Sequence, residues 1–189
     1  GAQNVKCPST QNFIGFYPNS EREVQSLIDF TLKTKPKLTI SYHTKGDVIY
    51  YGFEGQGEKD IERDKEIGSA LSESTGYPLI FTENSTGGYK DWCIQKLTIP
   101  AYTIEVGNEN LPHPIGEESL PLIYEQNKQV PLIALEMANK FSNSIDFATT
   151  KVQTNGYERT NFYATCNNAR IQSKAERRSA YWRSHRPKW

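Results

Sequence analysis

The pattern of apolar and polar residues first predicts a helix near the start of the chain. Its apolar stripe has helical spacing and consists of Val24, Leu27, Ile28, Thr31 and Leu32. Ser20 followed by Glu23 is a capping-box sequence, which predicts that the helix begins with Ser20 as its N-cap. Pro36 is expected to end the helix, because proline has no amide hydrogen to donate within it.

Strand and helix signals then alternate along the chain. Short runs rich in β-branched and aromatic residues predict strands at 38–42, 48–51, 77–81 and 101–106. Helices are predicted over 58–75, where Gly76 provides a C-cap, and between Gly88 and Leu97. Strands that alternate with helices predict an α/β fold with a mostly parallel or mixed sheet flanked by helices.

The last periodic segment is a predicted long helix, and the chain changes character after it. This helix is expected from Ser119 to about Phe141, with a kink at Pro131. Beyond it Asn, Ser, Thr and Arg dominate, and apolar residues lose their regular spacing. We therefore predict one domain over 1–141 and a basic, irregular tail over 142–189.

Composition supports a folded domain and limits the classes of partner. Hydrophobic residues make up 36% and aromatic residues 12% of the chain, which is typical of soluble globular proteins rather than disordered ones. No apolar run approaches the length that spans a bilayer, so no membrane partner is expected. The formal net charge is zero, yet residues 151–189 carry nine Lys and Arg against two Asp and Glu. Basic residues interleaved with aromatic ones can bind single-stranded nucleic acid, but a solvated tail is the interpretation we favour.

Two residues at predicted strand ends are candidates for chemistry. Glu105 interrupts the apolar strand 101–106, and a buried charge is costly unless it is paired or functional. His43 directly follows the strand 38–42, and ligands of open α/β sheets gather outside the carboxyl ends of strands. The alternatives are a Glu105 that faces water and a His43 that serves as a capping or surface residue. A zinc site needs about three protein ligands, and the chain has three histidines and no HxxH or HExxH motif.

A third candidate is the segment 87–92, which begins with two glycines. Gly87 and Gly88 would let a ligand approach the backbone, and the polar and aromatic residues after them could line a pocket. The alternative is a tight turn that leads into a helix, with Asp91 near the helix N-terminus and Trp92 in the core.

Taken in order, four segments resemble the zinc carboxypeptidase family of metallopeptidases. Residues 16–24 resemble the Ser-Glu-x-Glu entry into a helix, and residues 38–43 resemble the strand that ends in the third zinc-ligand histidine. Residues 86–92 resemble the Gly-Gly-x-x-Asp-Trp segment of the S1′ pocket, and residues 102–105 resemble the strand with the catalytic glutamate. The match covers about residues 1–141 and corresponds to the C-terminal half of the family's domain. The residues around His43 and Glu105 more closely resemble the bacterial branch of the family, which cuts γ-D-glutamyl-diamino acid bonds in cell-wall peptides.

The resemblance implies a role for each candidate. His43 would be a zinc ligand and Glu105 the general base, with zinc as cofactor and a peptide as substrate. Gly87, Gly88 and Lys90 would lie in the pocket for the substrate side chain, where the cation of Lys90 would favour a carboxylate. Glu83 falls where the family has a substrate-side tyrosine.

The resemblance also implies a missing partner. The family's His-x-x-Glu ligands and its carboxylate-binding arginines lie upstream of every segment present here, so the N-terminal half of the domain would have to complete the site. We predict zinc-dependent peptide hydrolysis that is incomplete in this chain. The alternatives are a non-catalytic module that binds cell-wall peptides or a partner on the same fold, and a nucleic-acid binder that uses the tail.

Overall fold

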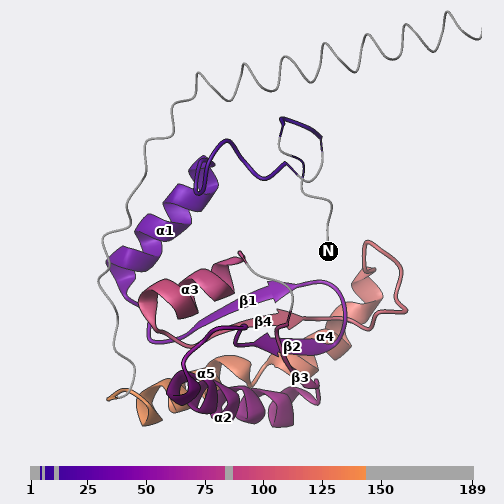
Figure 1. Cartoon of the computed structure of the whole chain (residues 1–189). Helices are drawn as coiled ribbons and strands as arrows, with labels where there is room; N and C mark the ends of the chain where they lie inside the picture. Colours follow the sequence, from indigo (N-terminus) through magenta and orange to yellow (C-terminus); the bar gives the residue numbers. More distant parts are fainter. Residues whose placement is uncertain (1–4, 6, 11–12, 84–86, 144–189) are drawn as a thin grey trace, which may run out of the picture. The chain divides into compact units, whose positions relative to one another are not determined.

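The computed structural model describes residues 5, 7–10, 13–83 and 87–143 (Figure 1). These residues fall into two compact units, one before residue 34 and one from Thr34 onward, and each is described by itself. The predicted tail over 142–189 lies, from residue 144, outside the described residues, so the predicted domain division stays a prediction. Within the described ranges, no helix is both long and apolar enough to cross a membrane.

Among its described residues, the first unit contains one isolated β-bridge and the predicted helix. Val5 pairs with Phe13, and helix α1 spans Arg22–Thr34. The prediction that Ser20 caps this helix is wrong, because the Ser20 hydroxyl is used in the preceding turn. It accepts a hydrogen bond from the Phe16 amide at 3.0 Å and donates one to the Glu21 carboxylate at 2.6 Å.

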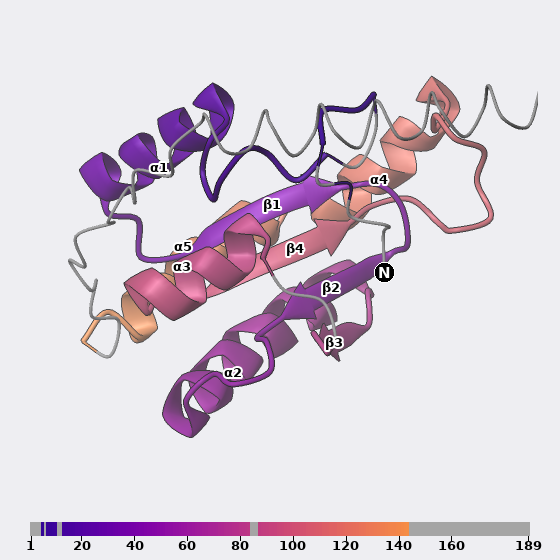
Figure 2. The ribbon, with the colours of Figure 1, turned by 45° about the horizontal axis from the view of Figure 1, so that its top comes forward.

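The second unit is built on a four-stranded mixed sheet. Its strands are β1 (Thr39–His43), β2 (Val48–Tyr51), β3 (Leu79–Phe81) and β4 (Ala101–Glu105). Figure 2 shows them side by side in the order β1-β4-β2-β3. Strand β1 pairs in parallel with β4 and β2 in parallel with β3, whereas β2 and β4 are antiparallel. The α/β prediction with a parallel or mixed sheet is confirmed.

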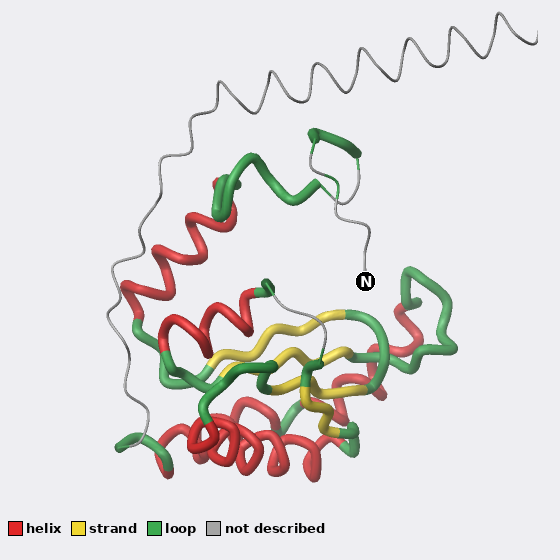
Figure 3. The backbone as a smooth tube through the Cα atoms, viewed as in Figure 1, coloured by secondary structure: helices red, strands yellow, loops and turns green. Residues whose placement is uncertain are grey.

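Helices cover both faces of this sheet. Helix α3 (Tyr89–Leu97) packs on β1 and β4, while α2 (Glu58–Thr75) packs on β2, β3 and the two last helices. Figure 3 shows α3 on one side of the sheet and α2 on the other. Helix α2 ends as predicted at Gly76, whose φ of 75° is the left-handed conformation that glycine adopts most readily.

The prediction of one continuous helix from Ser119 to Phe141 is wrong. A short 3-10 turn, Glu117–Ser119, leads into α4 (Leu120–Asn127), and α5 (Val130–Lys140) follows as a separate helix. Pro131 lies in the first turn of α5. A proline there cannot donate to the carbonyl four residues earlier, so the chain ends one helix and begins another instead of bending.

The core of the second unit lies between the sheet and α2. Tyr102 and Ile104 of β4 pack with residues of β2 and α2, and the buried cluster is Ile49, Tyr51, Ile67, Leu71, Tyr77, Tyr102, Ile104 and Val130. Successive side chains of a strand point to opposite faces. Because Tyr102 and Ile104 face the core, Thr103 and Glu105 face the opposite side, where α3 lies.

Candidate functional site

A cavity of about 700 Å³ lies on the α3 side of the sheet. All four strands and α3 contribute to its lining. The strands contribute Ser41, His43, Tyr50, Ile80, Phe81, Thr103 and Glu105, the segment after β3 contributes Thr82 and Glu83, and α3 with its N-cap contributes Gly88, Tyr89, Lys90 and Asp91. Five of the six candidate residues therefore line one cavity, and Gly87 is the exception.

His43 and Glu105 are the last residues of neighbouring parallel strands and are direct partners in the pairing register. Paired residues of adjacent strands project to the same face, which explains why both line the cavity. His43 is exposed and Glu105 is half-buried. The Oε2 atom of Glu105 is buried and has no hydrogen-bond partner among the described residues. A buried carboxylate oxygen without a partner is costly, and it is the kind of group that a ligand satisfies.

Hydrogen bonds join the backbone segments that follow β1 and β4, the strands that end in His43 and Glu105. The Val106 amide donates to the His43 carbonyl at 2.9 Å, and the Gly46 amide donates to the Gly107 carbonyl at 2.7 Å. The Lys45 ammonium donates to the Glu109 carbonyl at 2.6 Å and also to the carbonyl of Leu111. Hydrogen bonds therefore join the loops that follow β1 and β4 and hold the two strand ends side by side.

The two glycines before α3 have different tasks. Gly87 has a φ of 103°, a conformation that residues with a side chain rarely adopt, and it shapes the turn rather than the cavity wall. Gly88 lines the cavity, and its amide donates to the Asp91 Oδ2 atom at 3.1 Å. Asp91 thus acts at the N-terminus of α3, as the turn-into-helix alternative predicts for it.

Lys90 lines the cavity, and its ammonium already binds two other groups of the protein. Its side chain is 8% exposed, and its Nζ atom lies 2.5 Å from the Gly52 carbonyl oxygen and 2.5 Å from Asp91 Oδ1. An ammonium has three donors, and these two residues engage two of them. The cavity wall therefore carries an ion pair at this position rather than an isolated cation.

Glu83 is exposed at the rim of the cavity and precedes residues 84–86, which are outside the described residues. It adds a carboxylate to a cavity that already has Glu105 and Asp91, with the Lys90 ammonium as the counter-charge among the described lining residues.

A sequence model of the zinc carboxypeptidase family matches residues 1–130. The chain belongs to the zinc carboxypeptidase family. It is 34% identical over 116 residues to gamma-D-glutamyl-L-diamino acid endopeptidase 1 of Lysinibacillus sphaericus, a stretch that covers 61% of this chain and 28% of that protein. It is 27% identical over 115 residues to the uncharacterized protein YqgT of Bacillus subtilis (strain 168), covering 60% of this chain and 30% of that protein. The chain thus spans less than a third of the length of these curated relatives.

Membership in the zinc carboxypeptidase family implies a metal site, and the described residues show no complete one. His43 stands beside Glu105 at the cavity, but the described ranges contain no group of three His, Cys, Asp or Glu side chains that could hold a metal ion. Since a catalytic zinc takes about three protein ligands and an open position, His43 alone does not make a site.

Several residues that line the cavity were not predicted from the sequence. Ser41 and Thr103 lie two positions before His43 and Glu105, so the period of a strand could have placed them on the same face. Tyr50 has no such signal. It lies opposite Thr103 only because β2 pairs with β4 out of sequence order.

Proposed function

We propose that this chain carries the catalytic base and the side-chain pocket of a zinc-dependent peptidase site. Glu105 is the general base, His43 is one zinc ligand, and Glu83, Gly87, Gly88 and Lys90 form the substrate-binding wall. The observation that carries the proposal is the unpartnered, buried Oε2 atom of Glu105, which lines one cavity together with its register partner His43. Membership in the zinc carboxypeptidase family supports it.

The chemistry assigned to Glu105 is proton transfer. Bound zinc would polarise the scissile carbonyl and lower the pKa of a water. Glu105 takes a proton from the attacking water at its free carboxylate oxygen and returns it to the nitrogen of the leaving amine. The joined loops behind β1 and β4 hold Glu105 in place during both transfers.

The pocket wall indicates the class of substrate side chain. One N–H of Lys90 remains for a carboxylate of the substrate, while Asp91 and Gly52 hold the ammonium in place. The relative from Lysinibacillus sphaericus is named for cutting between γ-D-glutamate and an L-diamino acid. We propose a cell-wall γ-D-glutamyl-diamino acid peptide as the substrate, with its carboxylate-bearing end at Lys90.

The remaining zinc ligands are proposed to come from a His-x-x-Glu segment of the N-terminal half of the domain. The test joins such a segment to this chain, by fusion or co-expression, and measures zinc content and hydrolysis of a γ-D-glutamyl-diamino acid peptide. We expect both to appear together. Glu105→Gln should then abolish turnover and leave zinc bound, whereas Glu73→Gln on the exposed surface of α2 should change neither. Turnover that survives Glu105→Gln would refute the assignment of the base.

The second candidate function is binding without catalysis, as a module for cell-wall peptides or for a partner. It is favoured by the incomplete set of metal-binding side chains among the described residues. Calorimetry distinguishes the two functions. A binding module takes up the intact peptide at the same affinity with zinc and with a chelator, and the joined protein still does not cut it.

A further inference from the structure

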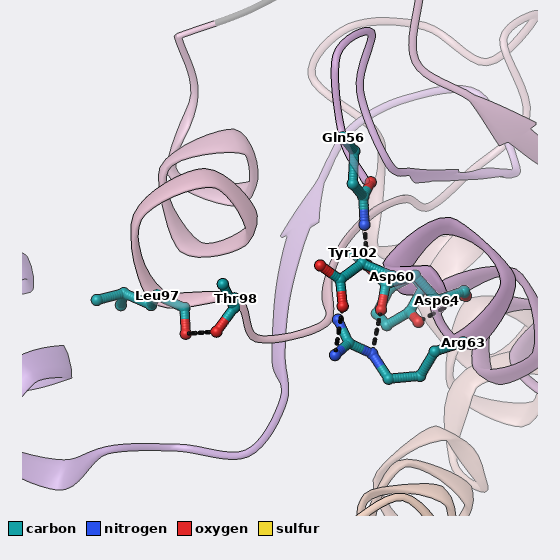
Figure 4. A network of polar contacts seen from close by, with 7 residues as sticks. All are labelled: Gln56, Asp60, Arg63, Asp64, Leu97, Thr98 and Tyr102. Atoms are coloured by element: carbon teal, nitrogen blue, oxygen red, sulfur yellow. Dashed lines mark hydrogen bonds and ion pairs between the residues drawn. The ribbon is translucent and has the colours of Figure 1, made fainter. Parts of the chain in front are cut away.

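A buried ion pair lies near the start of α2, apart from the cavity. Asp64 is completely buried, and its Oδ1 atom accepts a hydrogen bond from Arg63 Nε at 2.8 Å. Arg63 also reaches Asp60, and the Tyr102 hydroxyl donates to the Asp64 backbone carbonyl at 2.7 Å (Figure 4). Burial raises the pKa of Asp64, and the Arg63 hydrogen bond and charge oppose that shift. None of these side chains lines the cavity, so the peptidase chemistry leaves this pair unexplained.

The second oxygen of Asp64 holds the loop between β2 and α2. Gln56 lies in this loop, residues 52–57, and its Nε2 atom donates to Asp64 Oδ2 at 2.6 Å (Figure 4). A hydrogen bond to a fully buried carboxylate is stronger than one between neutral groups. The loop is therefore anchored to the protein interior at Gln56.

The same loop presents a carbonyl to the cavity wall. Gly52 has a φ of 59°, and a Cβ atom there would lie 2.5 Å from the Phe81 ring and 3.1 Å from Gln56 Oε1. A side chain at residue 52 would therefore clash with the Phe81 ring and crowd the Gln56 amide. The Gly52 carbonyl accepts the hydrogen bond from Lys90 Nζ at 2.5 Å. The 52–57 loop therefore completes one path from Asp64 to Lys90, because Gln56 binds Asp64 at one end of the loop and the Gly52 carbonyl binds Lys90 at the other.

We propose that Gln56 and Asp64 are positioning residues for Lys90. They fix the 52–57 loop so that the Gly52 carbonyl keeps the Lys90 ammonium in the cavity wall, with one N–H directed to a substrate carboxylate. The proposal rests on the proposed function only for the role of Lys90 in substrate recognition. The anchoring of Lys90 is measurable on the full 189-residue chain without any turnover.

The variants separate positioning from general stability. Gln56→Ala and Asp64→Ala both remove the anchor of the loop. Asp64→Asn removes the charge but keeps the contact, because Gln56 Oε1 is buried without a described partner and a flipped Gln56 amide can accept from the new Asn. Leu71→Ala is the matched control, since Leu71 is fully buried in α2 and takes no part in the path.

The experiment follows the Lys90 ammonium by NMR in chains labelled with ¹³C,¹⁵N-lysine. We expect its hydrogen exchange with water to be about tenfold faster in Gln56→Ala and Asp64→Ala, the factor that corresponds to losing one charge-assisted hydrogen bond. Asp64→Asn should restore exchange close to the wild-type rate. Leu71→Ala should lower the urea midpoint and leave the Lys90 exchange rate unchanged.

Two results would overturn the proposal. One is a Lys90 ammonium that stays protected in Gln56→Ala. The other is an exchange rate in Leu71→Ala that rises as much as in Gln56→Ala, which would mean general loosening. Failure of the proposed function would give a different result. Adding a γ-D-glutamyl dipeptide with a carboxylate-bearing diamino acid would then leave the Lys90 resonance of wild type unchanged, while the exchange rates of the variants would still follow the expected order.

Discussion

Replacing Lys90 by methionine tests whether its ammonium is held in the cavity wall. Methionine is close to lysine in length, so Lys90→Met removes the charge and leaves most of the packing intact. In the structure the ammonium makes two contacts, one with the Gly52 carbonyl and one with the Asp91 carboxylate, each at 2.5 Å. If the ammonium instead extended freely into the cavity, Lys90→Met would remove no contact. The free energy of unfolding would then stay the same or rise.

The expected loss follows from those two contacts. A hydrogen bond to a charged group contributes about 1.5–3 kcal/mol net, and breaking a buried ion pair costs about 3–5 kcal/mol. The Asp91 side chain is 13% exposed and keeps its bond from the Gly88 amide, which reduces the cost of losing its partner. The added apolar surface of methionine offsets a further part. We therefore expect Lys90→Met to lower the free energy of unfolding by roughly 3 kcal/mol.

Urea unfolding monitored by circular dichroism measures this loss. With a slope of about 1–3 kcal/mol per molar urea, the midpoint should fall by roughly 1–3 M. Lys65→Met on the exposed surface of α2 is the control and should stay within about 0.5 kcal/mol of wild type. A double-mutant cycle with Asp91→Asn should give a coupling energy of about 0.5–3 kcal/mol. A Lys90→Met chain as stable as wild type, with no coupling to Asp91, would refute the anchored lysine.

Three further outcomes are expected. Metal analysis and a peptide-hydrolysis assay of the purified chain alone should give far less than one zinc per chain and negligible turnover, because the described residues contain no group of three side chains that could hold a metal ion. Stoichiometric zinc with turnover that depends on Glu105 would contradict this expectation. Burial raises the pKa of Asp64 above its ordinary value of 3.8. The contribution of Asp64 to the free energy of unfolding is therefore complete below that pH and is lost as the pH rises through the raised pKa. The free energy of unfolding of wild type minus that of Asp64→Asn should therefore fall as the pH rises from below 3.8 through the raised pKa, and a difference that rises with pH would show the opposite shift. Ile104→Ala should lower the free energy of unfolding in urea by about 2–5 kcal/mol, because Ile104 is fully buried. Ile80→Ala should lower it clearly less, because Ile80 is 43% exposed. Equal losses would mean that the core is assigned to the wrong face of the sheet.

The spacing of apolar residues determined the elements themselves. Helix α2 and its end at Gly76 match the prediction, and so does the strand Val48–Tyr51, because period and capping are properties of a few neighbouring residues. The break between Asn127 and Val130 could not be predicted from the same pattern, since the apolar spacing continues across it. Whether a proline kinks a helix or divides it depends on how the two halves pack.

For the site, local reasoning placed His43 and Glu105 at strand ends but could not make them neighbours. Their adjacency follows from β4 inserting beside β1, a pairing between segments about sixty residues apart that no local pattern encodes. Lys90 shows the same limit more sharply. The family resemblance implies a cation in the substrate pocket, while the Gly52 carbonyl that holds this cation comes from a loop between other elements. Periodicity is a property of short segments, and the pairing of distant strands is decided only when the whole chain buries its apolar surface at once.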